Sequence, residues 1–154
     1  MEFADITEMS AAVGTDLPTG EWRLVGQDRI ELFADATDDH QWIHTDPVRA
    51  ASGPFGATVA HGFLTVSLLP ALCEGLYSLK GAAMAVNYGL NKVRFPAPVP
   101  AGSRIRARVC LAEVKPVPGG VQIVSLVTVE REGGDKPVCV AETVTRIYIA
   151  DATQ

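Results

Sequence analysis

The sequence predicts a single α+β domain in which a curved antiparallel sheet wraps around a central helix. Two observations carry this prediction. The longest apolar stretch of the chain, residues 60–77, has the composition of a buried helix, and the chain after residue 81 changes to long, strand-like segments. With 154 residues, the chain is long enough for one domain with its own core.

The first part of the chain combines short elements with loops. Residues 1–19 are expected to form an irregular lead-in, and residues 22–26 a short strand. Asp28 can cap the N-terminus of a helix. The apolar residues of that helix keep a roughly helical period: Ile30, Leu32, Phe33 and Ala36.

Acidic and proline residues mark the segments that follow. Residues 37–44 are expected to be loop. Asp46 followed by Pro47 predicts one further helical turn, because proline is favoured at the first helical position. The buried helix of residues 60–77 contains Pro70, which should kink or divide it.

Four segments after residue 81 have the pattern of strands: residues 84–95, 104–111, 121–130 and 138–149. The second of them alternates arginine with apolar residues, which gives one basic and one apolar face. Glycine-rich turns at residues 118–120 and 133–135 separate the last three segments, so these should form an antiparallel meander.

Composition narrows the class of protein. The net charge of −5 argues against non-specific nucleic-acid binding, which needs a basic surface. The sequence shows neither a basic, apolar leader nor an apolar run near the ~18 residues of a membrane span, so we expect no membrane partner. The cysteines lie in apolar segments without metal-ligand spacing, which indicates reduced, buried thiols in a cytoplasmic protein: Cys73, Cys110 and Cys139.

An acid and a histidine lie close together in the loop segment. Asp39 stands five residues before His44, with Asp38 as a competing acid. Histidine transfers protons near neutral pH, and a carboxylate in a water-poor pocket can act as acid or base. The sequence leaves open which of the two is the base. The structural alternative is that Asp39 caps a turn and His44 is a core histidine.

Gly62 opens the apolar helix. Unpaired N–H groups at a helix start favour a developing negative charge, and glycine permits close approach of a substrate. Gly62 is therefore a candidate oxyanion donor, unless the glycine serves only tight packing. The preceding His61 is expected to be a positioned loop residue rather than a second base.

These segments resemble the (R)-specific enoyl-CoA hydratase, or MaoC-like dehydratase, family. Its motif is roughly G-D-x-N-P-[ILV]-H, followed by A/V-H-G at a helix start. The chain has D-H-Q-W-I-H over residues 39–44, A-H-G over residues 60–62 and V-R-F-P-A-P-V-P-A-G over residues 93–102. The resemblance begins near Gly20 and looks closest to the nodulation-protein-N-like branch. It implies the hotdog fold, and its spacing favours Asp39 as the acid.

The resemblance implies a hydro-lyase that reversibly hydrates trans-2-enoyl-CoA to (R)-3-hydroxyacyl-CoA. Asp39 and His44 would be catalytic and flank one water, and Gly62 would be the oxyanion donor. It implies no cofactor beyond the coenzyme A of the substrate, and a homodimer with the site near its interface. We expect no metal, because the chain has no ligand-spaced set of histidines and cysteines.

The chain departs from the family motif in ways that bear on substrate preference. Gln41 replaces the usual asparagine and keeps an amide that can position water. Trp42 replaces the usual proline and either packs in the core or lines the substrate pocket with Phe63. Pro70 stands where some members have a serine, a role that Ser67 can fill.

Basic residues beside the proline-rich turn are candidates for binding the phosphates of coenzyme A. Lys92 and Arg94 flank this turn, and arginine in particular suits phosphate geometry. The arginines of the alternating strand are the alternative, although a solvated strand face explains them equally: Arg104, Arg106 and Arg108.

Two other functions are compatible with the motifs. An acyl-CoA thioesterase would use a carboxylate and water on the thioester carbonyl and would release free coenzyme A. A non-catalytic module would bind acyl thioesters without turning them over. Acyl chain length, and coenzyme A against an acyl carrier protein as the handle, stay open.

Overall fold

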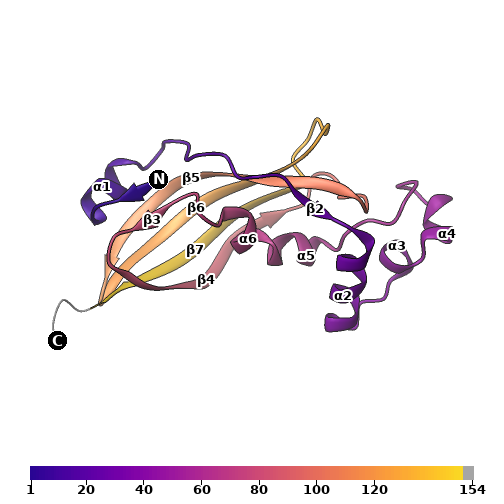
Figure 1. Ribbon diagram of the computed structural model, residues 1–154, viewed down its shortest axis with the longest axis horizontal. Helices are drawn as coiled ribbons and strands as arrows, with labels where there is room; N and C mark the ends of the chain where they lie inside the picture. The colour runs from indigo at the N-terminus through magenta and orange to yellow at the C-terminus, as the bar shows by residue number, and fades with distance from the viewer. Residues whose placement is uncertain (151–154) are drawn as a thin grey trace.

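The computed structural model describes residues 1–150, and its centre is a curled five-stranded sheet (Figure 1). The strands lie in the order β2–β5–β6–β7–β4, and every neighbouring pair is antiparallel. Their bounds are β2 Arg23–Val25, β4 Ala82–Arg94, β5 Ser103–Val117, β6 Gly120–Arg131 and β7 Cys139–Ile149. Two short strands, β1 (Glu2–Phe3) and β3 (Ser78–Leu79), pair in parallel beside this sheet. The predicted meander of the last three strands is confirmed.

Among residues 1–150, six helices accompany the sheet: α1 Ile6–Ala11, α2 Gln27–Thr37, α3 Trp42–Thr45, α4 Pro47–Ala51, α5 Gly62–Ser67 and α6 Leu69–Cys73. Figure 1 shows α5 and α6 lying along the sheet, with α2, α3 and α4 gathered beyond one end. The predicted α+β class, with a curved antiparallel sheet packed against a central helical segment, is confirmed. Within residues 1–150, no helix is long and apolar enough to cross a membrane.

The core lies between the sheet and the helical segment. Along β5, every second side chain is almost fully buried, and the arginines between them point to the opposite face: the buried residues are Ile105, Ala107, Val109 and Leu111. They belong to one cluster with Leu64, Leu69 and Leu72 of α5 and α6. Each isoleucine, valine or leucine among them stabilises the fold by about 1.5–3 kcal/mol when fully buried, so the period-two pattern fixes which face of β5 meets the helices.

Pro70 divides the expected long central helix into two. Leu68 ends α5 and begins α6, and Pro70 stands in the first turn of α6, where its missing N–H costs little. The backbone stays helical through the junction, because Leu68 N–H donates to the Leu64 carbonyl at 3.0 Å and Leu72 N–H to the Leu68 carbonyl at 2.9 Å. The helical hydrogen bonds therefore continue across the junction, except for the one that Pro70 cannot donate.

The first part of the chain is more regular than the sequence suggests. Residues 1–19 contain β1 and α1, so the expected irregular lead-in is wrong. Asp5 accepts a hydrogen bond from Glu8 N–H and caps α1. Helix α2 starts at Gln27 with Gly26 as its N-cap, so Asp28 lies in the first turn and is not the cap.

The segment that carries the acid and the histidine is only partly loop. His44 lies on the short helix α3, because the chain makes one helical turn after Gln41. The predicted start of α4 is confirmed: the Asp46 carboxylate accepts from Arg49 N–H at 2.9 Å, and Pro47 occupies the first turn.

The two edges of the large sheet differ. The β5 side is covered by β2 and by residues 14–20, whose N–H groups donate to β5 carbonyls, for example Leu17 to Val109 at 2.9 Å. The outer edge of β4 pairs with no strand among the described residues, and its side chains are almost all exposed. β4 also carries three more residues than the stretch of β7 it pairs with, at Ala83, Tyr88 and Asn91.

Candidate active site

Three elements bring the site together at one end of the helical segment. Asp39 lies in the loop after α2, His44 on α3, and His61 at the N-cap of α5. One carboxylate oxygen of Asp39 and one ring nitrogen of each histidine lie within 4.8 Å of one another. The structure thus places the two predicted catalytic residues next to each other and adds a second histidine.

Asp38, the competing acid, is the C-terminal cap of α2. It ends α2 in the left-handed conformation with φ of 57°, which aspartate and asparagine adopt more readily than most residues. The chain reverses there, so that Asp39 and not Asp38 lies among the groups that approach the histidines.

His44 is buried, and its ring is fixed by one main-chain bond. The side chain is 7% exposed, and Nδ1 lies 2.6 Å from the Val59 carbonyl oxygen. A carbonyl only accepts, so Nδ1 must carry the proton for this hydrogen bond to form. In the neutral ring, Nε2 is then left with a free lone pair, which is what a general base requires.

The environment keeps His44 neutral near pH 7. Burial lowers the pKa of His44 below its ordinary 6.5, and the neighbouring His61 lowers it further; the bond to Val59 and the charge of Asp39 oppose these effects without cancelling them. The lowered pKa means that the imidazole remains available as a proton acceptor.

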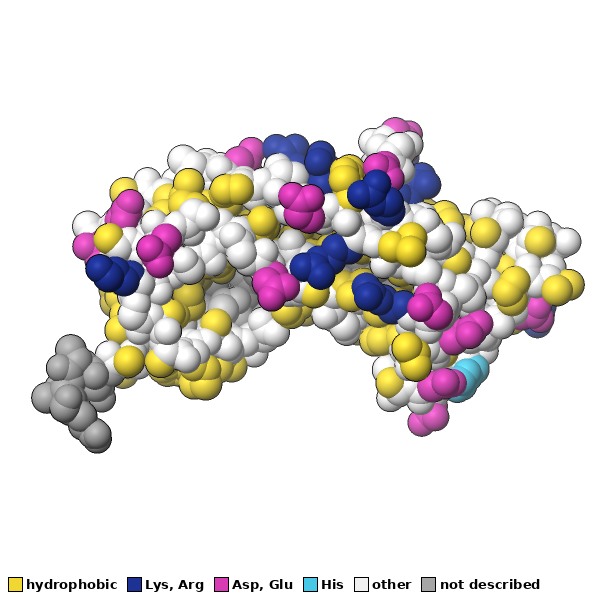
Figure 2. Space-filling view, in the orientation of Figure 1, with side chains coloured by type: hydrophobic (Ala, Val, Ile, Leu, Met, Phe, Trp, Pro, Cys, Tyr) yellow, Lys and Arg dark blue, Asp and Glu magenta, His cyan; other side chains and the backbone are white. Residues whose placement is uncertain are grey.

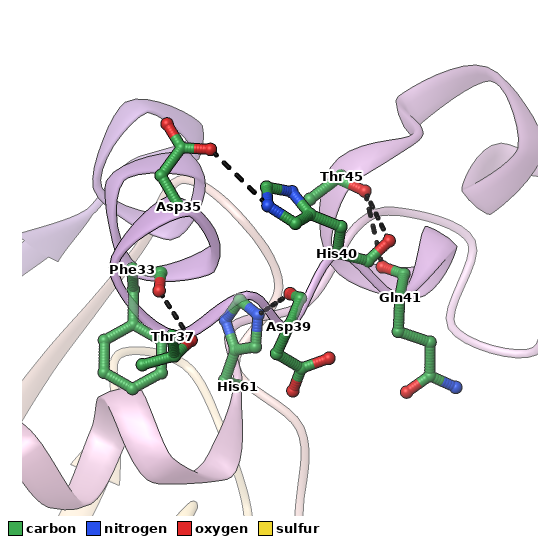
Figure 3. Close-up of polar contacts among 8 residues, drawn as sticks. All are labelled: Phe33, Asp35, Thr37, Asp39, His40, Gln41, Thr45 and His61. Carbon is green, nitrogen blue, oxygen red and sulfur yellow. Dashed lines mark hydrogen bonds and ion pairs between the residues drawn. The ribbon is translucent and has the colours of Figure 1, made fainter.

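His61 is predicted to be a positioned loop residue, and in the structure it contacts both Asp39 and His44. It is 2% exposed, its Nε2 lies 2.9 Å from the Asp39 carbonyl oxygen, and its ring stacks on His44 with centroids 3.7 Å apart. Figure 3 shows that Asp39 meets His61 through its main chain, whereas its carboxylate points away from that contact. The carboxylate of Asp39 is exposed and therefore free to meet a substrate.

Gln27 supports His44 from α2. Its amide donates to the His44 carbonyl at 2.8 Å and accepts from the Thr58 hydroxyl at 2.5 Å. Nothing in the sequence marks Gln27 for this role, because it is a polar residue in the first turn of a helix, far along the chain from Thr58.

Gly62 begins α5, as the sequence predicts. A Cβ placed on this residue would stand 2.9 Å from the ring of Phe95, so any larger residue here would have to displace that ring. The first N–H groups of a helix have no acceptor within that helix, which leaves Gly62 N–H available as a donor. Its role as oxyanion donor stays a prediction.

The three predicted substrate contacts near the motif differ in surroundings. Gln41 is exposed, and in Figure 3 its amide extends away from His61. Trp42 is half-buried and packs on α4, with the Arg49 guanidinium 4.3 Å from its ring and Gly53 against its edge. Phe63 is 75% exposed on the first turn of α5.

A mostly apolar groove of about 860 Å³ runs between the helical segment and the sheet. It is lined by α5, α6 and residues of the strands β3 to β7, among them Val66, Ser67, Cys73, Ala85, Leu90 and Val127. Figure 2 shows the hollow beside hydrophobic side chains in the lower left of the view, where β4 lies in Figure 1. Ser67 is five residues beyond Gly62, about 7 Å along a helix, so the groove begins one to two turns from the proposed oxyanion donor.

The cysteines are unpaired thiols, as expected, although only Cys139 is fully buried. Burial raises the pKa of both Cys73 and Cys139 to about 11. The Cys73 thiol in the groove is therefore protonated and a poor nucleophile.

The basic residues divide into paired and unpaired groups. Lys92 and Arg94 are exposed at the end of β4, and neither forms an ion pair with a residue in the described range 1–150. The β5 arginines instead pair with neighbouring carboxylates: Arg104 with Glu132 at 3.1 Å, Arg106 with Glu130 at 3.0 Å and Arg108 with Asp16 at 3.1 Å. The triplet has the contacts of a solvated strand face.

Asp39, His44 and His61 are also near enough to one another to suggest a metal ion. However, the two imidazole planes are stacked with an angle of 26° between them. The imidazole lone pairs lie in these two nearly parallel planes, whereas one ion bound by both rings would have to lie close to both planes at once, so this arrangement favours proton transfer over metal binding. The absence of a metal in the working protein stays a prediction.

Comparison with known proteins agrees with this geometry. The family described as MaoC like domain matches residues 8–144. The chain is 53% identical over 149 residues to 3-hydroxyacyl-thioester dehydratase Z of Mycobacterium tuberculosis, covering 96% of this chain and 98% of the relative. It is 44% identical over 151 residues to Nodulation protein N of Rhizobium leguminosarum bv. viciae, covering 96% and 93% of the two chains.

The fold has close counterparts among solved structures. The unliganded R-hydratase PhaJ1 of Pseudomonas aeruginosa superposes with a TM-score of 0.74 at 23% identity, covering 95% of this chain and 86% of that one. The predicted hotdog fold is confirmed by this likeness. With a family match over most of its length and a relative at 53% identity across nearly the whole chain, this chain belongs to the family of MaoC-like dehydratases.

Proposed function

We propose that this chain catalyses the reversible addition of water to a trans-2-enoyl-CoA, giving the (3R)-3-hydroxyacyl-CoA. The observation that supports the proposal is the Asp39 carboxylate beside a buried, neutral His44 whose Nδ1 is tied to Val59. The name of the M. tuberculosis relative, a 3-hydroxyacyl-thioester dehydratase, supports the same reaction class.

The chemistry needs a group that moves one proton between water and carbon. In hydration, His44 Nε2 takes a proton from water while the water oxygen bonds to C3, and the electrons of the double bond move toward the thioester carbonyl. The imidazolium then gives that proton to C2 on the same face. Asp39 orients the water and stabilises the transient positive charge on His44. Dehydration is the reverse: His44 removes the C2 proton and returns it to the departing hydroxyl.

The thioester oxygen gains negative charge as the enolate forms. We assign its stabilisation to the N–H of Gly62 at the start of α5. The α5 helix is only six residues long, so the hydrogen bond rather than the helix dipole would carry this effect.

The rest of the substrate has two places to bind. The acyl chain would lie in the groove between the helical segment and the inner face of the chain's own sheet. The unpaired Lys92 and Arg94 would meet the phosphates of coenzyme A, and no other cofactor is required. The exposed edge of β4 would pair with a second copy to form a homodimer.

The direct test is hydration of crotonyl-CoA, followed by loss of the enoyl-thioester absorbance and by the stereochemistry of the product. We expect (R)-3-hydroxybutyryl-CoA and no free thiol. Release of free coenzyme A would instead identify a thioesterase, and binding without turnover would identify a non-catalytic module.

The pH dependence of hydration follows from the lowered pKa of His44. Because only the neutral ring can accept a proton, activity should be retained at and above pH 6.5 and be lost as the pH falls through the lower pKa of the folded protein. We therefore expect the acid limb of kcat/KM to have an apparent pKa below 6.5. A limb at or above that value would contradict the assignment of His44 as the base.

The role of Gly62 can be separated from its packing by two substitutions. Gly62→Ala and Gly62→Pro both introduce a Cβ toward Phe95, but only proline removes the N–H. We expect kcat of the proline variant to be lower than that of the alanine variant by about 10²-fold, as for loss of one oxyanion donor. Equal activity of the two variants would mean that Gly62 is needed only for packing.

A further inference from the structure

We propose that His61 is a positioning residue, which ties the main chain of Asp39 to an imidazole stacked on His44 and so sets the geometry of the acid–base pair. This inference rests on the proposed hydration, since it assigns a role within the same site. His61 lies at the junction of the loop after α2, α3 and α5, and it contacts both predicted catalytic residues.

The hydrogen bond to Asp39 fixes the tautomer of His61. The Asp39 carbonyl can only accept, so His61 Nε2 carries the proton at their separation of 2.9 Å. This contact holds the peptide of Asp39 and leaves its carboxylate free (Figure 3). A loop residue without such a bond would have the freedom of its loop, and a displacement of about 1 Å can cost ~10²-fold in rate.

The other ring nitrogen of His61 destabilises the fold, so efficient packing alone does not explain why a histidine stands here. Nδ1 is buried and has no hydrogen-bond partner among the described residues. Leaving a buried polar atom unpaired is unfavourable, and an apolar side chain at this position would avoid that penalty. Histidine at position 61 is accounted for by the Nε2 donor, because that donor is the only polar contact its ring makes within residues 1–150.

Stacking completes the arrangement. The His44 and His61 rings stack at 3.7 Å, and the Phe33 ring also packs on His61, tilted by 52° with centroids 5.1 Å apart. A ring held in this way cannot rotate without displacing Phe33 or His44. His61 therefore fixes the Asp39 backbone and the plane of His44 at the same time.

Two substitutions separate the donor from the ring. His61→Gln keeps an N–H donor at the same number of bonds from Cα as Nε2 but loses the aromatic face. His61→Phe keeps a ring to stack on His44 but has no donor. We expect His61→Phe to lose about 10²-fold in kcat with KM nearly unchanged, and His61→Gln to keep at least a tenth of the wild-type kcat. His40→Phe, at an exposed histidine that meets only Asp35 and the Thr45 hydroxyl, should leave kcat unchanged.

The relative kcat of the two variants shows whether His61 acts through its donor or only fills space. If His61 only fills space, the more apolar phenylalanine should be at least as active as glutamine, and that order would overturn the proposal. Melting temperatures of both variants show whether a loss of kcat reflects unfolding. Should both variants unfold, the NMR measurement below decides alone.

Ring-nitrogen NMR gives a readout that does not depend on turnover. The chain has three histidines, so long-range ¹⁵N–¹H spectra of the imidazoles can be assigned with His40→Phe. We expect His61 protonated on Nε2 and His44 protonated on Nδ1. A wild-type His61 protonated on Nδ1 would overturn the positioning contact. If no enoyl thioester is hydrated but these tautomers are found, the proposed function fails while the His61–Asp39 contact stands.

Discussion

We expect Asp39→Asn and His44→Gln each to lower the kcat of crotonyl-CoA hydration by about 10²–10⁴-fold, the usual value of a positioned proton-transfer group. Both substitutions are close to isosteric. His44→Gln removes the ring nitrogen that accepts the proton of water, and Asp39→Asn removes the charge that orients the water and stabilises the imidazolium. Steady-state kinetics at pH 7, with circular dichroism to confirm the fold, measure the effect.

Asp38→Asn is the matched control for these variants. Asp38 is the neighbouring acid, it ends α2 in the left-handed conformation, and asparagine tolerates that conformation as well as aspartate does. We expect its kcat to stay near the wild-type value. If the Asp39 and His44 variants fold and keep near-wild-type hydration, the pair is not catalytic.

We expect lysine at Met84 and Val86 to convert the proposed homodimer into a monomer with little activity. The two side chains are 54% and 37% exposed on the open edge strand β4, within the stretch of β4 between the extra residues Ala83 and Tyr88. Juxtaposed like charges cost several kcal/mol, so dissociation constants should rise by about 10²-fold or more. Activity should fall as well, because the groove is bordered by β4 and a partner there would form part of its wall.

Sedimentation velocity at assay concentrations measures the assembly, and two matched controls show which edge is used. Leu24→Lys places the same charge on β2 at the opposite edge, and Leu32→Lys places it on α2; the native side chains are 58% and 69% exposed. Both controls should remain dimeric and active. A wild-type protein that is monomeric and active under these conditions would contradict a site at the interface.

The strands and the core follow closely from the sequence because their signals are local. Alternation of arginine with apolar residues in β5 decides which face is buried, and glycine-rich turns decide where neighbouring strands reverse. Prolines were equally informative: Pro47 marked the start of α4, and Pro70 marked the division of the central helix. The exact break at Leu68 was not predictable, since proline is tolerated at any position of a first helical turn.

The site could be predicted only in part. Asp39 and His44 carry a recognisable spacing, and the structure brings them together. The Val59 carbonyl that fixes the tautomer of His44 has no signal in the sequence, because every residue has a carbonyl. The stacking of His61 on His44 depends on how the loop after α2 meets the start of α5, which is a tertiary relation. The helix α1 is short, with only six residues, and although Ile6, Met9 and Val13 keep a helical spacing, so brief a period was not recognised.

The three extra residues of β4 bear on the colloidal behaviour of the protein. A long, apolar, unpaired strand is ordinarily a template for fibrous aggregation, in which flat strands stack without limit. Each extra residue bends β4 and interrupts the row of N–H and C=O groups it offers, so that only short straight stretches are available. A second copy related by a two-fold axis presents the same contour and can match one such stretch. Strands of other proteins, or a growing stack of copies, would meet an edge that is interrupted at each extra residue, so we expect β4 to pair with one partner strand and not to seed a fibre.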